Sequence, residues 1–171
     1  MRKHEKIFPV ILTIWPYLLF LFLIVPDKTG KNHMMFLTIY TIETILIYGF
    51  NIWNAFAFRG TEEKLAFYGM MVKLFHIPFY LAGFAAGILC LFVMVVPAFL
   101  LISPILILIL AAAEYLLMIV SSSYGISAAL RVRKKQKLSK ASAVVYLITH
   151  CIFAADVISS VFLYRKIKNV S

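Results

Sequence analysis

Charged residues are scarce in this chain, and acidic ones are scarcer still. Only 14% of its 171 residues are charged, and only 7 are Asp or Glu. Soluble domains usually carry about 25% charged residues. A large water-soluble domain is therefore excluded, and the function must reside within apolar segments or in the short loops between them.

Catalytic and cofactor-binding signatures are also missing. The sequence contains no HExxH, GxSxG, GxGxxG or P-loop pattern, and no pair of histidines at metal-ligand spacing. The cysteines, Cys90 and Cys151, lie in apolar stretches without CxxC spacing, which favours small buried side chains over a disulfide or a metal site. We expect no cofactor and no metal, and an intramembrane enzyme is the least supported class.

What the chain has in abundance is long apolar runs, which hold most of its 63% hydrophobic residues. A helix needs about 20 apolar residues to cross the hydrocarbon core of a bilayer. The runs predict an all-α, polytopic transmembrane helix bundle, a single integral membrane domain over residues 1–171. We expect about five spans, at residues 7–25, 34–58, 74–96, 105–130 and 141–164.

The third apolar segment is too long for one span. A continuous helix over residues 62–96 would measure about 52 Å, against a hydrocarbon core of about 30 Å. Pro78 disfavours helical geometry at the residue before it. We therefore expect a break near His76, with a short amphipathic interfacial helix at residues 62–75 before the third span.

Basic residues gather in one loop and at the N-terminus. Six of them fall in RVRKKQKLSK, residues 131–140, and three fall in the first six residues. Cytoplasmic loops carry an excess of Lys and Arg, which predicts a cytoplasmic N-terminus in a bacterial cytoplasmic membrane or a plasma membrane. Five spans leave the basic C-terminal tail on the opposite side. A four-span alternative, with one apolar segment re-entrant, would return it to the cytoplasm.

The same basic loop predicts the kind of partner that this surface binds. Basic clusters beside transmembrane helices bind anionic lipid head groups, which we expect at residues 131–140. No aromatic residue interleaves with the basic ones to stack on bases, so we expect no nucleic-acid partner.

Three acids remain within the predicted spans: Glu43, Glu114 and Asp156. Counted from the predicted outer ends, all three lie roughly 12–14 Å below the outer boundary. Intramembrane charges are costly, about 2.5–3.5 kcal/mol even on a permissive scale, and often functional. Neighbouring carboxylates in a low dielectric either retain protons or hold a cation. This pattern predicts a polar site for binding or transport of an ion, a proton or a small solute.

Further polar residues accompany these acids. Some share a helix face with them, whereas His150 is rotated about 120° from Asp156 on one continuous helix. The alternative interpretation is structural, because interhelical hydrogen bonds in membranes contribute about 0.6 kcal/mol each and need no transport role. The residues added to the predicted site are Asn51, Asn54, Ser121 and His150.

Lys73 and His76 lie one helical turn apart at the predicted inner end of the third span. Two interpretations remain open. The pair forms an inner-interface site for a head group or a gate. Otherwise Lys73 extends to the interface, and His76 bonds backbone that Pro78 leaves free.

Small residues indicate close helix packing. Gly83 and Gly87 form a GxxxG pattern, and Gly125 lies on the same helix face as Ser121. Such faces join helices within one chain or between chains. A second hypothesis follows: a non-catalytic regulatory, immunity or assembly protein that binds a partner membrane protein or further copies of itself.

Overall fold

The computed structural model describes residues 4–24, 31–136, 138–150 and 152–169, and within these ranges it contains only helices. The all-α prediction is therefore confirmed. The helices in chain order are α1 (His4–Ile24), α2 (Lys31–Ala57), α3 (Glu62–Val93), the 3-10 helix η1 (Pro97–Phe99), α4 (Ile102–Lys134), α5 (Lys140–Thr149) and α6 (Phe153–Lys168).

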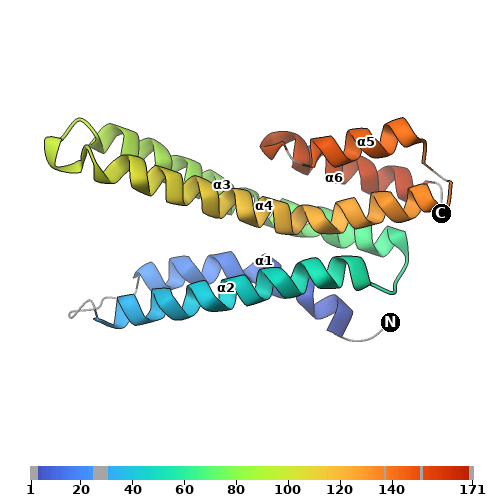
Figure 1. Cartoon of the computed structure of the whole chain (residues 1–171), viewed down its shortest axis with the longest axis horizontal. Helices are drawn as coiled ribbons and strands as arrows, with labels where there is room; N and C mark the ends of the chain where they lie inside the picture. Colours follow the sequence, from blue (N-terminus) through green and yellow to red (C-terminus); the bar gives the residue numbers. More distant parts are fainter. Residues whose placement is uncertain (1–3, 25–30, 137, 151, 170–171) are drawn as a thin grey trace.

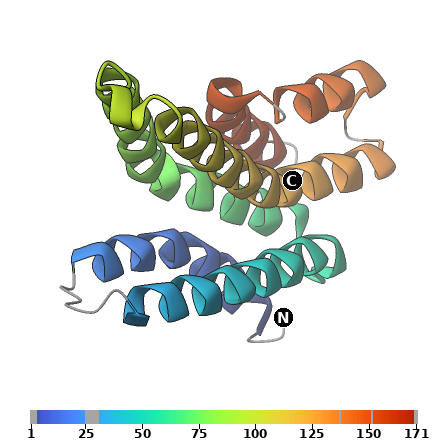
Figure 2. The same cartoon turned by 60° about the vertical axis from the view of Figure 1, so that its left-hand side comes forward.

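A long hairpin of α3 and α4 is the central axis of the molecule (Figure 1). Helices α1 and α2 form a second hairpin along one side of this axis, and α5 and α6 form a shorter third hairpin along the other (Figures 1 and 2). Helix α3 contacts α1, α4 and α6, while α4 contacts α2, α3, α5 and α6. The α3–α4 hairpin therefore holds the two outer hairpins together.

In the part of the chain that the structure describes, three helical segments are long and apolar enough to cross a membrane: Met34–Ala57, Glu62–Val93 and Ile102–Lys134. Their outward faces carry large apolar side chains, among them Phe92 with 71% and Leu108 with 70% of its surface exposed. Soluble monomers rarely expose contiguous apolar surface of this kind. These exposed apolar faces are of the kind that a membrane-spanning helix presents to lipid.

Helix α3 is continuous through Pro78, so the predicted break near His76 and the separate interfacial helix at residues 62–75 are wrong. The helix starts at Glu62 because the Thr61 side chain accepts a hydrogen bond from the backbone N–H of Lys64. One turn before Pro78, the Tyr17 hydroxyl of α1 donates to the Phe75 carbonyl. Neighbouring helices satisfy backbone near an intrahelical proline in this way, which lets the helix continue.

The predicted fifth span, residues 141–164, is not one helix. Helix α5 has 10 residues and α6 has 16, about 15 Å and 24 Å respectively. The two fold back on each other: the hydroxyls of Thr149 and Ser159 lie 2.7 Å apart, and Lys166 Nζ donates to the Ser142 hydroxyl at 3.4 Å. The segment therefore leaves and returns at the same end of the bundle (Figure 1).

That end also holds the turn between α2 and α3. Arg131 of α4 donates to the carbonyls of Phe56 and Phe58 at the end of α2. Lys135 forms an ion pair with Glu62 at 2.9 Å, at the start of α3. Two residues of the basic loop region therefore connect the end of α4 to the two sides of the α2–α3 turn.

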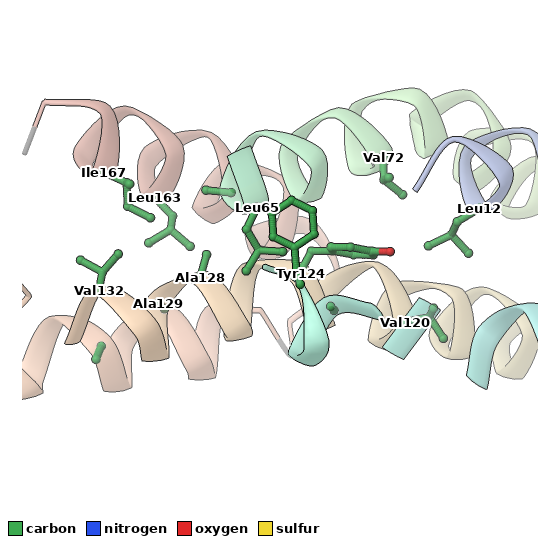
Figure 3. Close-up of a cluster of buried hydrophobic side chains, with 14 of the residues drawn as sticks. Leu12, Leu65, Val72, Val120, Tyr124, Ala128, Ala129, Val132, Leu163 and Ile167 are labelled. Atoms are coloured by element: carbon green, nitrogen blue, oxygen red, sulfur yellow. The ribbon is translucent and has the colours of Figure 1, made fainter. Parts of the chain in front are cut away.

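Buried apolar side chains fill the space between α3, α4 and α6 (Figure 3). Ala128 and Ala129 of α4 are fully buried, and their small size lets the neighbouring helices approach closely. Leu163 and Ile167 of α6 belong to the same core. Through this core, α6 packs against α3 and α4 at the end of their hairpin that carries the basic loop.

The folded-back α5–α6 hairpin makes a topological prediction. Single cysteines introduced as Lys140→Cys and Lys168→Cys, in a chain with Cys90→Ala and Cys151→Ala, should react with an impermeant maleimide from the same side of sealed membrane vesicles. Lys31→Cys, at the start of α2, should react from the other side. Labelling of positions 140 and 168 from opposite sides would contradict the folded-back arrangement.

Candidate functional site

Asp156 of α6 is 1% exposed, and one of its oxygens, Oδ1, gathers side chains from three other parts of the chain. Lys73 of α3 forms an ion pair with it, and the Ser122 hydroxyl of α4 donates to it at 2.9 Å. His150, the residue that ends α5, brings Nδ1 within 3.0 Å of the same oxygen. We call Lys73, Ser122, His150 and Asp156 the ionic cluster.

The ionic cluster lies in the interior, not at an interface. Lys73 is 0% exposed, and Ser122 and His150 are each 1% exposed. Charged side chains are almost never fully buried unless they are paired, because removing an ion from water costs several kcal/mol. Asp156 supplies that partner, so Lys73 does not extend to the membrane interface.

The break between α5 and α6 is what assembles the ionic cluster. His150 and Asp156 are six positions apart, and on one continuous helix they would point about 120° away from each other. With the chain folded back, both reach Lys73, whose Nζ lies 3.4 Å from His150 Nδ1. Ser122 fixes the bend from α4, since its hydroxyl also lies 3.0 Å from the His150 carbonyl.

His150 is the member of the ionic cluster with a ring nitrogen that lacks a hydrogen-bond partner among the described residues. This nitrogen, Nε2, is buried. If Nδ1 donates to Asp156, Nε2 is free to accept a proton; if Nδ1 accepts from Lys73, Nε2 carries one. Gly125 makes room for this ring, because a Cβ at that position would overlap His150 Nε2.

The three predicted acids do not meet in the structure. Only Asp156 belongs to the ionic cluster. Glu43 lies on the exposed side of α2, and Glu114 is half-buried in α4 against Gly83. A similar depth along three helices therefore does not bring these side chains into one cavity.

The predicted asparagines join α2 to α4. The Tyr124 hydroxyl of α4 donates to Asn51 Oδ1 at 2.8 Å and accepts from Asn54 Nδ2 at 3.2 Å. Ser121 donates to the Met118 carbonyl of its own helix at 2.9 Å. Asn51 and Asn54 thus make interhelical hydrogen bonds, whereas this bond of Ser121 stays within α4.

His76 bonds a backbone carbonyl near a proline, but this proline lies in α1 and is not Pro78 of its own helix. Its Nε2 lies 3.0 Å from the Leu12 carbonyl of α1. Four residues later stands Pro16, which has no N–H to donate to that carbonyl. Lys73 and His76 therefore face different partners, α6 and α1, and do not form one inner-interface site.

Sequence reasoning missed Ser122 and the pairing of Lys73 with Asp156. A rule was available for the pair, because opposite charges inside spans usually partner each other. No local signal distinguishes Ser122 from Ser121 and Ser123, since only the rotation of α4 decides which hydroxyl faces Asp156.

We expect Gly125→Ala to destabilise the folded protein, because the added methyl group overlaps the buried His150 ring. Overpacking of this kind typically costs about 1–3 kcal/mol. Gly49→Ala is the matched control, because a Cβ at Gly49 meets nothing within 4 Å. Thermal unfolding in detergent should show a lower midpoint for Gly125→Ala alone. Equal midpoints for the two variants would contradict this arrangement of His150.

Comparison with known proteins identifies a family. Residues 5–169 match the model of a family of unknown function, DUF6652. No curated protein and no solved structure matches the chain. Because the match covers nearly the whole sequence, the chain belongs to the DUF6652 family.

Proposed function

We propose that this protein is a small integral membrane protein that transfers protons through the ionic cluster. The observation that carries the proposal is the meeting of Lys73, His150 and Asp156 in the interior of an apolar helix bundle. Ionisable side chains inside membranes are rare and costly, and they commonly belong to proton or ion pathways. Three such groups in mutual contact can pass a proton from one to another.

Protons fit this site better than a bound metal cation. Among the described residues, no group of three or more His, Cys, Asp and Glu side chains could hold a metal ion. Lys73 already neutralises Asp156, so a cation would have to displace an ammonium group. A proton can instead bind Nε2 of His150, which has no hydrogen-bond partner among the described residues, without removing either partner of the ion pair.

The proposal includes four membrane crossings, with α5–α6 as a re-entrant hairpin. Three are the apolar segments of α2, α3 and α4, and we add α1, whose 21 residues measure about 32 Å. This is the four-span alternative, and charge placement supports it. One end of the bundle holds the α2–α3 turn, the basic loop and the end of α6. The described basic residues belong to this end, except Lys31 and the buried Lys73. An excess of Lys and Arg marks the cytoplasmic side, so the N-terminus is cytoplasmic.

The same charge placement supports a lipid partner. Arg133, Lys134 and Lys140 are exposed around the basic loop, and Arg165, Lys166 and Lys168 are exposed at the end of α6. Basic residues near a membrane surface each contribute about 1 kcal/mol of attraction to anionic lipids. This end of the bundle therefore binds anionic head groups of a bacterial cytoplasmic membrane or a plasma membrane.

One observation favours the second candidate, a non-catalytic interaction protein. Glu43 is exposed on α2 among apolar side chains such as Ile42 and Leu46, which are 55% and 54% exposed. A carboxylate facing lipid is costly. A partner membrane protein, or a second copy of this chain, would stabilise it by donating a hydrogen bond. Co-purification that is lost on Glu43→Leu would favour this candidate.

Proton flux into proteoliposomes tests the first proposal. Purified protein is reconstituted with an internal pH-sensitive dye, and a potassium diffusion potential drives the flux. We expect wild-type protein to exceed empty liposomes, and Asp156→Asn to reduce the flux at least tenfold, because the neutral amide cannot exchange a proton. Glu63→Gln, at the start of α3, is the control and should retain the flux.

A folding check on each variant separates loss of proton flux from loss of the folded structure. Each variant is first shown to be monodisperse and helical in detergent. Wild-type flux no greater than that of empty liposomes contradicts proton transfer. A folded Asp156→Asn protein with full flux would remove the ionic cluster from the pathway.

A further inference from the structure

A hollow of about 220 Å³ lies between α3 and α4, away from the ionic cluster and nearer the η1 end of the hairpin. Its walls include Phe84 and Ile88 of α3 and Leu110 of α4. Among the described residues that line it, Glu114 alone carries a charge. The hollow is therefore an apolar space with a single carboxyl group.

Glu114 is unsatisfied in this position. Its Oε1 is buried and has no hydrogen-bond partner among the described residues. The carboxyl group lies against Gly83, where a Cβ would overlap Oε1. Glu114 as a residue is half-buried, but its Oε1 is fully buried, and buried polar atoms normally have a partner. A ligand that donates hydrogen bonds and carries positive charge would remove this deficit.

The glycine pattern contributes space to the hollow. A GxxxG pattern normally brings two helix backbones together. A Cβ at Gly87, however, would meet nothing within 4 Å, so Gly87 makes no tight helix contact. Gly83 makes room for the carboxyl group, and Gly87 leaves room beside it.

The depth of the hollow restricts the ligand. Glu114 is 12 residues after the start of α4, about 18 Å along the helix, and Gly83 is 10 residues before the end of α3, about 15 Å. The head group of a phospholipid stays at the membrane surface, whereas a small amine can enter the apolar interior. Pockets for drug-sized ligands measure about 300–1,000 Å³, so this hollow admits only a small head and a short arm.

We propose that this hollow binds a lipophilic primary amine, with its ammonium group on Glu114 and its hydrocarbon arm against Phe84, Ile88 and Leu110. The ammonium supplies the missing donors and charge, and the arm occupies the apolar space that Gly87 leaves open. The site is independent of the proposed proton transfer, because it shares no residue with the ionic cluster.

Binding of n-hexylamine to full-length protein in phosphatidylcholine nanodiscs tests this assignment, with 1-hexanol as the neutral probe of similar size. Calorimetric titration should show saturable binding of hexylamine and at least tenfold weaker binding of hexanol. Glu114→Gln, which keeps the side-chain shape, should weaken hexylamine binding at least tenfold. Gly87→Leu should abolish it by filling the hollow.

Glu43→Gln is the matched control, because Glu43 is an exposed acid of α2 that does not line the hollow, and its replacement should leave hexylamine affinity unchanged. Equal affinities for hexylamine and hexanol, or wild-type affinity in Glu114→Gln, would overturn the proposal. Loss of hexylamine binding in nanodiscs that contain phosphatidylethanolamine would also overturn it, because the ammonium group would then come from the lipid. Proton flux measured on Glu114→Gln should equal that of the wild type, which keeps the two proposals distinguishable.

Discussion

The ion pair between Lys73 and Asp156 determines how the C-terminal part of this chain folds. Left unpaired in an apolar interior, either charge would cost several kcal/mol. Paired, they fix α6 against α3, and His150 on the same carboxylate oxygen fixes the end of α5. The chain must bend between α5 and α6 for both residues to reach Lys73. The folded-back hairpin therefore allows His150 and Asp156 to reach Lys73 together.

Most other polar side chains in the bundle complete hydrogen bonds that the backbone or a neighbour would otherwise lack. His76 bonds the carbonyl that Pro16 leaves free, Arg131 bonds the end of α2, and Tyr124 joins two asparagines to α4. Among the described residues, the buried side-chain atoms without a hydrogen-bond partner include His76 Nδ1, His150 Nε2 and Oε1 of Glu114. Our two proposals concern the latter two atoms: a proton at His150 and a ligand at Glu114.

The apolar runs predict the helices well because hydropathy records which residues avoid water. The apolar runs do not predict in which direction each polar side chain points or which side chains pair. Asp156 and Lys73 are 83 positions apart, and the rotation of the two helices that carry them, α3 and α6, decides that they meet. Pro78 indicated a break, but the contacts of neighbouring helices keep α3 intact. The position of an acid along its helix predicts its depth in the membrane, but not the direction in which its side chain points. Glu43, Glu114 and Asp156 therefore lie in three different surroundings.

A double-mutant cycle on Lys73→Met and Asp156→Leu, followed by thermal unfolding in detergent, tests the central role of the ion pair most directly. Breaking a buried pair typically costs about 3–5 kcal/mol, whereas replacing both partners with apolar residues is often close to neutral. We expect each single variant to unfold at a much lower temperature, and the double variant to recover most of that loss. Additive losses in the double variant would contradict the pairing of Lys73 with Asp156.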